Sequence, residues 1–150
     1  MPDLDDLHNL QTIATRSAAA MIKGDHAAAM LGIKLESVSP GFAQMSMVVR
    51  EDMLNGHGIC HGGIIFALAD TAFAYACNSR NEKTVALSCV INYSASAALA
   101  DVLKAVARER SLSRRTGVYD VEIQNQRAET IAFFRGTSYK TSAPVYSGVE

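Results

Sequence analysis

Residues 54–78 read LNGHGICHGGIIFALADTAFAYACN, and this stretch decides the fold of the chain. A glycine-rich loop is followed by about four helical turns with no proline and no interior glycine after Gly63, which predicts a helix ending near Asn78. Apolar residues lie on every side of this helix, and such a helix is normally covered on all faces. Because it is too short to span a bilayer, a curved sheet is its most plausible cover.

Two polar residues, Asp70 and Thr71, interrupt the apolar run of this helix. A carboxylate in the middle of an apolar helix loses hydration, which destabilises the fold unless hydrogen bonds or a reaction explain its presence. Asp70 is therefore either a catalytic group or a structural residue bonded to Thr71 or to a neighbouring backbone N–H. The sequence leaves both alternatives open.

The start of the helix favours the catalytic alternative. Gly62 and Gly63 stand where the first N–H groups of a helix lack internal acceptors, and glycine lets a ligand come close to the backbone. Such N–H groups, at the positive end of the helix dipole, can form an oxyanion hole. The alternative is that the two glycines only permit a tight turn.

Length and composition fit one domain over residues 1–150. Of the 150 residues, 49% are hydrophobic, which is enough to fill one core. A net charge of −1 gives no large basic field, so nucleic acid is not an expected partner. Three cysteines, an odd number, read as reduced and mostly buried thiols. The acidic N-terminus lacks an apolar signal region and no long apolar stretch follows, so we expect a cytoplasmic protein with no membrane segment.

The hydrophobic period predicts the elements on either side of the central helix. Residues 1–27 form an N-terminal helical segment, with an amphipathic helix over 5–23 and a second short helix over 26–31. From residue 33 the period is that of strands, and 84–93 reads as a strand covered on both faces. The predicted strands are residues 33–38, 42–49, 84–93, 101–111, 118–125 and 130–141.

This order predicts an α+β fold in which a mostly antiparallel six-stranded sheet curves around one long helix. The N-terminal helices would cover the outside. The tail, residues 142–150, is small and polar, and we expect it to fray.

A longer motif covers the loop and the helix, reading NGHxxxHGGxxFxLADTAFA over residues 55–74. It resembles the signature of the hotdog-fold acyl-CoA thioesterases, specifically of the phenylacetate-degradation thioesterase family. The later strands and the turn at 114–117 extend the resemblance over residues 28–141. It implies a hotdog fold and hydrolysis of aryl-acyl-CoA thioesters such as phenylacetyl-CoA or hydroxyphenylacetyl-CoA. It also implies no metal and no Ser-His-Asp triad. No cofactor is expected, because the coenzyme A thioester is the substrate.

Spacing constrains how Gly62 and Asp70 can act together. They are eight residues apart, which is about 12 Å along a helix, so they cannot touch one carbonyl from the same helix. Two such helices laid antiparallel across a twofold axis would bring Asp70 of one subunit to Gly62 of the other. The resemblance implies the same shared site in a homodimer, and we expect these dimers to pair further into a homotetramer.

The expected catalytic residues are Asp70, Gly62, Asn55 and Thr71. The Gly62 N–H would bind the thioester carbonyl, and Asp70 would activate water or attack the carbonyl itself. Asn55 resembles the family residue that positions the carbonyl or the water, with turn formation as its alternative role. Thr71 is a candidate hydroxyl partner for the water.

A second group of residues is expected to bind the substrate. Arginine pairs well with phosphate oxygens, and by resemblance the turn at 114–117 is the candidate site for the nucleotide, although a solvated edge strand would look the same. Aromatic residues could border the acyl group or simply belong to the core. The full set is His61, Gly63, Phe66, Phe73, Asn92, Tyr93, Arg114, Arg115, Thr116 and Gly117.

Other chemistries have weaker support in the sequence. His57 and His61 have the spacing of a helical metal pair, but the glycines around them argue against a helix and no third ligand is evident. Cys60 beside His61 suggests a thiol nucleophile, although adjacent residues of an extended loop point apart. A hotdog enoyl-CoA hydratase, or a CoA-ester-binding sensor without turnover, are the alternative functions.

Overall fold

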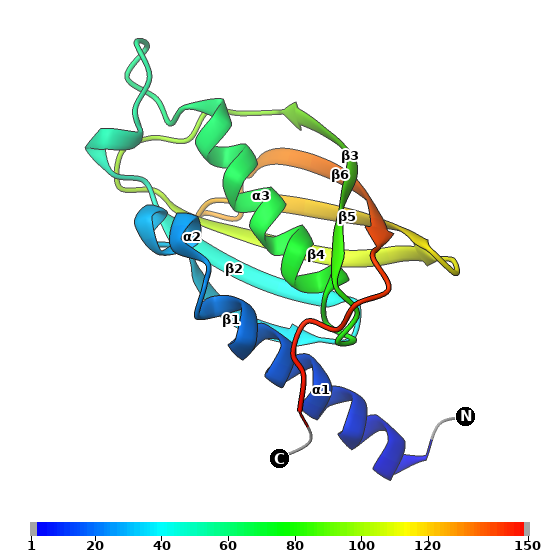
Figure 1. Cartoon of the computed structure of the whole chain (residues 1–150). Helices are drawn as coiled ribbons and strands as arrows, with labels where there is room; N and C mark the ends of the chain where they lie inside the picture. The colour runs from blue at the N-terminus through cyan, green and yellow to red at the C-terminus, as the bar shows by residue number, and fades with distance from the viewer. Residues whose placement is uncertain (1–2, 149–150) are drawn as a thin grey trace.

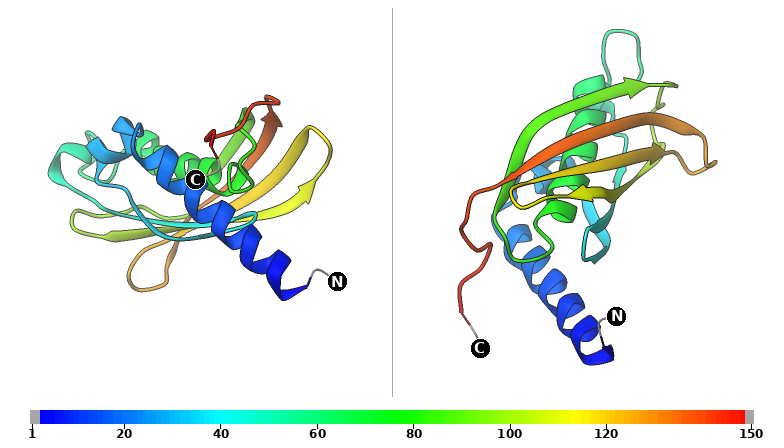
Figure 2. Two further views of the ribbon diagram at one scale, coloured as in Figure 1. Left: turned by 60° about the horizontal axis from the view of Figure 1, so that its bottom comes forward. Right: turned by 90° about the vertical axis from the view of Figure 1, so that its right-hand side faces the viewer.

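In the computed structural model, which describes residues 3–148, one antiparallel sheet curves around a central helix (Figures 1 and 2). The sheet has six strands in the order β1-β2-β4-β5-β6-β3. Every neighbouring pair of strands is antiparallel. The elements are α1 (Leu4–Ile22), α2 (His26–Leu31), β1 (Lys34–Ser39), β2 (Phe42–Val48), the 3-10 helix η1 (Glu51–Met53), α3 (Gly62–Cys77), β3 (Thr84–Tyr93), β4 (Val102–Leu112), β5 (Thr116–Gln124) and β6 (Thr130–Lys140).

This arrangement confirms the predicted α+β fold, with the long helix against six strands and two helices before them. The predicted helices and strands are all present, with ends that shift by a few positions. Thr116 and Gly117 were expected in a connection, but they begin β5, because their backbone pairs with Tyr139 and Ser138 of β6. Within residues 3–148, no helix is both long and apolar enough to cross a membrane.

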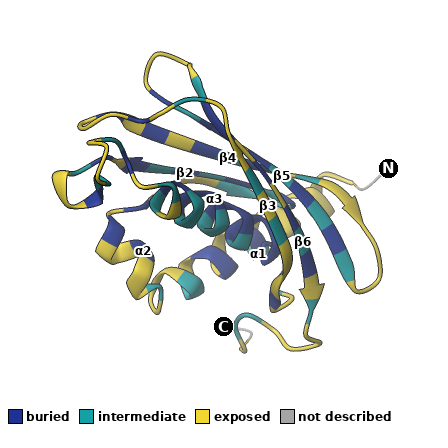
Figure 3. Ribbon diagram, turned by 90° about the horizontal axis from the view of Figure 1, so that it is seen from above, coloured by how far each residue is buried: buried dark blue, intermediate teal, exposed yellow. Residues whose placement is uncertain are grey.

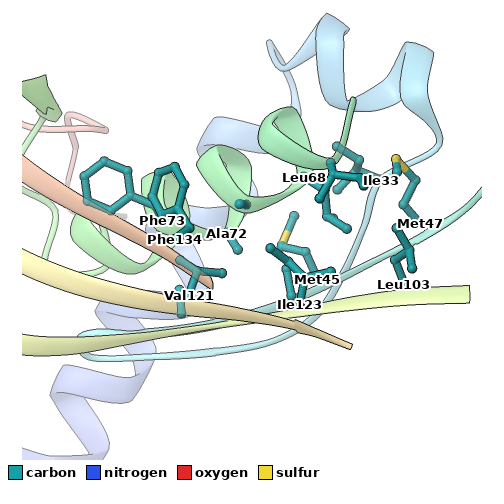
Figure 4. Close-up of a cluster of buried hydrophobic side chains, with 14 of the residues drawn as sticks. Ile33, Met45, Met47, Leu68, Ala72, Phe73, Leu103, Val121, Ile123 and Phe134 are labelled. Atoms are coloured by element: carbon teal, nitrogen blue, oxygen red, sulfur yellow. The ribbon is translucent and has the colours of Figure 1, made fainter. Parts of the chain in front are cut away.

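The core lies between α3 and the inner face of the sheet (Figure 4). Residues along β4 alternate between buried and exposed, as Figure 3 shows by colour, because one face of the strand packs on the helix. The rings of Phe73 and Tyr119 meet edge to face with centroids 5.5 Å apart. Gly136 of β6 makes room for this cluster, because a Cβ there would lie 2.8 Å from the Phe73 ring. The missing side chain at Gly136 therefore leaves the space that the Phe73 ring of α3 fills.

Strand β3 corrects one prediction. Its apolar run was expected to be largely covered on both faces, yet β3 is an edge strand on which four large apolar side chains are between 47% and 62% exposed. These side chains are Val85, Leu87, Val90 and Tyr93. A continuous apolar run is typical of a covered strand, but it does not indicate whether the strand lies inside the sheet or at its edge.

The central helix also keeps an uncovered stripe. Ile64, Ala67, Thr71 and Ala74 are only half-buried, and their spacing of three and four places them on one side of α3. The sheet covers the opposite side, where Leu68 and Ala72 are fully buried. One chain therefore does not surround its own apolar helix.

The C-terminal tail makes specific contacts with the rest of the chain. Asn81 has a left-handed backbone with φ of 58°, and its side-chain oxygen accepts the N–H groups of Val145 and Tyr146 at 3.0 and 2.9 Å. The Arg16 guanidinium of α1 lies 5.1 Å from the centre of the Tyr146 ring. These contacts hold Val145 and Tyr146 against Asn81 and α1, and the fraying of the tail stays a prediction. Residues 1–2 and 149–150 of the predicted terminal segments lie outside the described residues.

Candidate active site

Asp70 lies in the middle of α3, half-buried, with its carboxylate free of hydrogen bonds from any residue of the described chain. Burial raises the pKa of Asp70 above its ordinary value. Thr71 does not bond to it, because the Thr71 hydroxyl donates to the Ala67 carbonyl at 2.7 Å. The structural interpretation of Asp70 requires a hydrogen-bond donor to its carboxylate, and residues 3–148 provide none.

The Asp70 carboxylate borders a groove of about 480 Å³. This volume falls within the roughly 300–1,000 Å³ that is typical of small-molecule sites. The groove lies between α3 and the start of β3, and α1 and the C-terminal tail form its other walls. Its apolar lining includes Met21, Phe73, Val85 and Val145. A carboxylate without a partner thus stands beside an apolar cleft large enough for an organic acyl group.

The first turn of α3 presents one backbone donor. His61 caps the helix, since its ring nitrogen Nδ1 accepts the Gly63 N–H at 2.9 Å and its carbonyl accepts the Ile64 and Ile65 N–H groups. The Gly62 N–H has no acceptor among the described residues. Of the two glycines singled out from the sequence, Gly62 therefore keeps a free donor, and the Gly63 donor is occupied.

Tyr93 of β3 lies against this same turn. Its hydroxyl donates to the Gly62 carbonyl at 2.7 Å, and a Cβ on residue 62 would lie 3.1 Å from the Tyr93 hydroxyl. Burial raises the pKa of Tyr93, which keeps the hydroxyl protonated and able to donate. Tyr93 was expected to border the acyl group; the structure shows that it holds the residue that offers the backbone donor.

Asn55 forms the turn that precedes the helix. Its side-chain oxygen accepts the N–H groups of His57 and Ile59 at 2.9 and 3.4 Å, and its own N–H donates to the Ile59 carbonyl. The turn-forming role left open by the sequence is thus present. The Asn55 side-chain NH₂ group makes no hydrogen bond within residues 3–148, so it can still donate to a ligand.

The arginine turn borders a second groove of about 350 Å³, which Arg114, Arg115 and Lys140 line together. Arg115 donates to the Tyr139 hydroxyl at 3.3 Å, and Lys140 pairs with Glu82 at 2.6 Å. Gly117 has a packing role instead. It is buried, and a Cβ there would lie 2.8 Å from the Tyr119 ring.

The remaining predicted residues are spread over the molecule. Phe66 packs edge to face on Phe134 with centroids 5.4 Å apart, and Phe73 belongs to the core while its ring reaches the Asp70 groove. Asn92 is exposed on β3 opposite Phe133.

No group of three or more His, Cys, Asp or Glu side chains lies together in residues 3–148 in a way that could hold a metal ion.

The thiol alternative finds no support in the geometry. The Cys60 Sγ points to the His61 carbonyl oxygen at 3.8 Å rather than to the ring, and burial raises the pKa of Cys60. A raised pKa lowers the thiolate fraction, and the thiolate is the nucleophilic form. Asp70 and Gly62 therefore stay the predicted chemical groups of the site.

Comparison with known proteins decides the family. Residues 57–132 match the family model described as the thioesterase superfamily. The acyl-coenzyme A thioesterase PaaI of Escherichia coli (strain K12) is 46% identical over 132 residues, which are 88% of this chain and 94% of that protein. The chain belongs to the thioesterase superfamily.

Solved structures agree with this membership. The structure of the E. coli PaaI protein from the phenylacetic acid degradation operon superposes with a TM-score of 0.89 at 46% identity, covering 90% of this chain and 98% of that one. The structure of smu.793 from Streptococcus mutans UA159 bound to acetyl CoA has a TM-score of 0.72 at 30% identity, covering 75% of this chain and 90% of that one. The predicted hotdog fold and the prediction of a thioester hydrolase are confirmed.

Sequence reasoning missed most of the groove of this thioesterase, including residues from three segments outside α3. Met21 comes from α1, Lys83 from the connection before β3, and Val145 from the tail, and all three line the groove with Asp70. They lie far from the signature motif along the chain, and no local pattern marks them. The bond between Tyr93 and Gly62 was missed for the same reason, because 31 positions separate the two residues.

Proposed function

We propose that this thioesterase hydrolyses aryl-acyl-CoA thioesters, such as phenylacetyl-CoA or hydroxyphenylacetyl-CoA, to the free acid and CoA. The observation that carries the proposal is the unpartnered Asp70 carboxylate beside an apolar groove. The names of the relatives support the CoA thioester, since one is an acyl-coenzyme A thioesterase and another was solved bound to acetyl CoA. Three free cysteines support a reducing compartment, and we place the enzyme in the cytoplasm.

Two routes at Asp70 fit the geometry. As a general base, Asp70 takes a proton from water while the water oxygen bonds to the thioester carbon. As a nucleophile, its carboxylate oxygen bonds to that carbon, and water later cleaves the resulting anhydride. In both routes the carbon–sulfur bond breaks and CoA leaves as its thiol after gaining a proton. The raised pKa of Asp70 makes it a stronger base than an exposed aspartate.

The backbone donor of Gly62 would stabilise the negative charge that forms on the carbonyl oxygen. An N–H group without an internal acceptor at the positive end of a helix is suited to this role. The free NH₂ of Asn55 would orient the carbonyl or the water, and the lone pairs of the Thr71 hydroxyl could accept a hydrogen bond from that water.

We further propose that two subunits share each site. Gly62 and Asp70 lie about 12 Å apart along α3, so one carbonyl cannot reach both in a single chain. The exposed apolar side chains of the edge strand β3 and the half-buried stripe of α3 support a second copy packing here, because pairing would remove both from water. Pairing of these dimers into a tetramer stays a prediction.

The nucleotide of CoA would bind in the groove lined by Arg114 and Arg115. Arg114 forms no ion pair within the described residues, and the Arg115 guanidinium donates there only to the Tyr139 hydroxyl. Both guanidinium groups can therefore pair with phosphate oxygens. Thr116 and Gly117 would contribute by fixing this turn, because they begin β5 and pair with β6.

A direct assay tests the proposed function. The protein is mixed with phenylacetyl-CoA and a thiol reagent, and release of CoA at a rate well above that of an Asp70→Asn control supports hydrolysis. Tight binding without release would instead identify a CoA-ester sensor. Loss of the enoyl absorbance of crotonyl-CoA would identify a hydratase, and either of these outcomes contradicts the proposal.

A further inference from the structure

The groove extends well beyond Asp70. It follows α3 toward the end of the helix, where Asn78 also lines it, and these two residues are eight positions or about 12 Å apart along the axis. At that far end the Asn78 side chain is fully engaged, because it donates to the Thr84 carbonyl and accepts the Thr84 N–H, each at 2.9 Å. The end of the groove is thus a fixed wall rather than a free loop.

Lys83 provides the only cationic side chain that lines this groove in the described chain. Its backbone is held on both sides, since its N–H donates to the Ala143 carbonyl at 2.7 Å and its carbonyl accepts the N–H and the hydroxyl of Thr141 at 2.9 and 2.8 Å. Thr141 and Ala143 thus fix where the Lys83 side chain starts.

The ammonium group of Lys83 is not neutralised. It forms no ion pair within residues 3–148, and the neighbouring acid Glu82 pairs with Lys140 instead, at 2.6 Å. It does not pair with Asp70 either, although both line the groove. The groove therefore has a carboxylate at one end, a cation at the other and apolar walls that include Phe73 and Val145 between them.

We infer that this groove binds the acyl group, and that Lys83 selects aryl-acyl groups that carry an anionic substituent on the side of the ring far from the thioester. The inference rests on the proposed function. The ring lies between the apolar walls, and the substituent accepts charge-assisted hydrogen bonds from the Lys83 ammonium. The opposite orientation is excluded, because it would bring the substituent to the Asp70 carboxylate, where like charges repel.

A matched pair of thioesters tests this inference. Phenylacetyl-CoA is compared with the CoA monothioester of 1,4-phenylenediacetic acid, which adds a carboxymethyl group across the ring, and kcat/KM is measured for both. Lys83→Met should lower the ratio of the two values, carboxylated over plain, by about fivefold, the size of one partly screened ion pair. Lys83→Glu should lower it further, and Lys83→Arg should keep it. Lys34→Met, which removes an exposed cation from β1, is the control.

The outcomes separate the inference from the proposed function. Equal ratios in the parent and in Lys83→Met, including a parallel loss of both activities, would overturn the role of Lys83 and leave thioester hydrolysis intact. An equal drop in the ratio for Lys34→Met would assign the effect to overall charge, which also overturns it. If the parent protein hydrolyses neither thioester, the proposed function fails and this inference fails with it.

Discussion

The Tyr93 hydroxyl donates to the Gly62 carbonyl at 2.7 Å, which ties the edge strand β3 to the first residue of α3. Residue 62 is the one whose N–H is free to bind a developing oxyanion. A side chain 50% exposed on the sheet edge is thus joined to the peptide at the helix start. We therefore expect Tyr93 to help position residue 62 and its donor.

Tyr93→Phe is therefore expected to lower kcat several-fold while changing stability by at most about 1 kcal/mol, because one partly exposed hydrogen bond is lost. Steady-state kinetics and thermal melting check both parts. Tyr146→Phe, which keeps the ring over Arg16, serves as the control and should have parental kinetics. A Tyr93→Phe enzyme with unchanged kcat would show that the bond does not position Gly62.

Asp70→Asn is expected to remove most turnover and keep the fold. The amide is nearly isosteric, but it can act neither as base nor as nucleophile. The rate and the thermal midpoint should be measured on the same sample. Turnover near the parental rate would make Asp70 a structural residue.

The pH dependence of stability gives a second test of Asp70. Burial raises its pKa in the folded state, so ionising it destabilises the fold, and this cost is absent below the unfolded-state pKa of about 3.8. The cost appears as pH rises through the raised value. Asp70→Asn should consequently melt at or above the parental temperature at pH 7, and the two proteins should converge as pH falls below 4. A variant that melts lower than the parent at pH 7 would contradict this sign.

The double change Arg114→Ala and Arg115→Ala is expected to raise KM several-fold for CoA esters and much less for a truncated pantetheine thioester. Only the CoA ester carries the nucleotide phosphates that the guanidinium groups would bind. Arg110→Ala, which removes an exposed arginine paired with Asp120, controls for a general loss of positive charge. Equal changes for the two substrates would remove this turn from the binding site.

The shared site predicts complementation between two inactive proteins. One carries Asp70→Asn, and the other carries Gly62→Pro, which deletes the backbone donor at a helix position that tolerates proline. After joint unfolding and reassembly in equal amounts, about half the dimers should be mixed, with one intact site of two, so about one quarter of parental activity should return. The Tyr93 side chain must shift slightly for proline, and thermal melting of the Gly62→Pro protein checks its folding.

Complementation has a clear negative result. If each site lies within one chain, every site carries one lesion and activity stays absent. Mixed dimers that form, as native mass spectrometry would show, but remain inactive would rule out the shared site.

Much of this protein can be predicted from its sequence because the signals are local. The period of the apolar residues fixes which segments become helices and strands, and the all-round apolar helix requires a sheet to cover it. The position of Asp70 within that helix and of Gly62 at its start predicts which groups carry the chemistry. These inferences depend only on neighbours along the chain.

The tertiary structure decided what depends on pairs that are distant in sequence. The apolar run of β3 could not indicate that this strand lies at a sheet edge, and the polar tail could not indicate that Asn81 would bind it across 65 positions. The orientation of the His61 ring decided which of the two glycine N–H groups is bonded. The ring accepts the Gly63 N–H and leaves the Gly62 N–H free. The place of Lys83 in the Asp70 groove also depends on distant residues, because its backbone is hydrogen-bonded to Thr141 and Ala143. Long-range hydrogen bonds of this kind leave no period or motif in the sequence, since either partner could bond elsewhere in another fold.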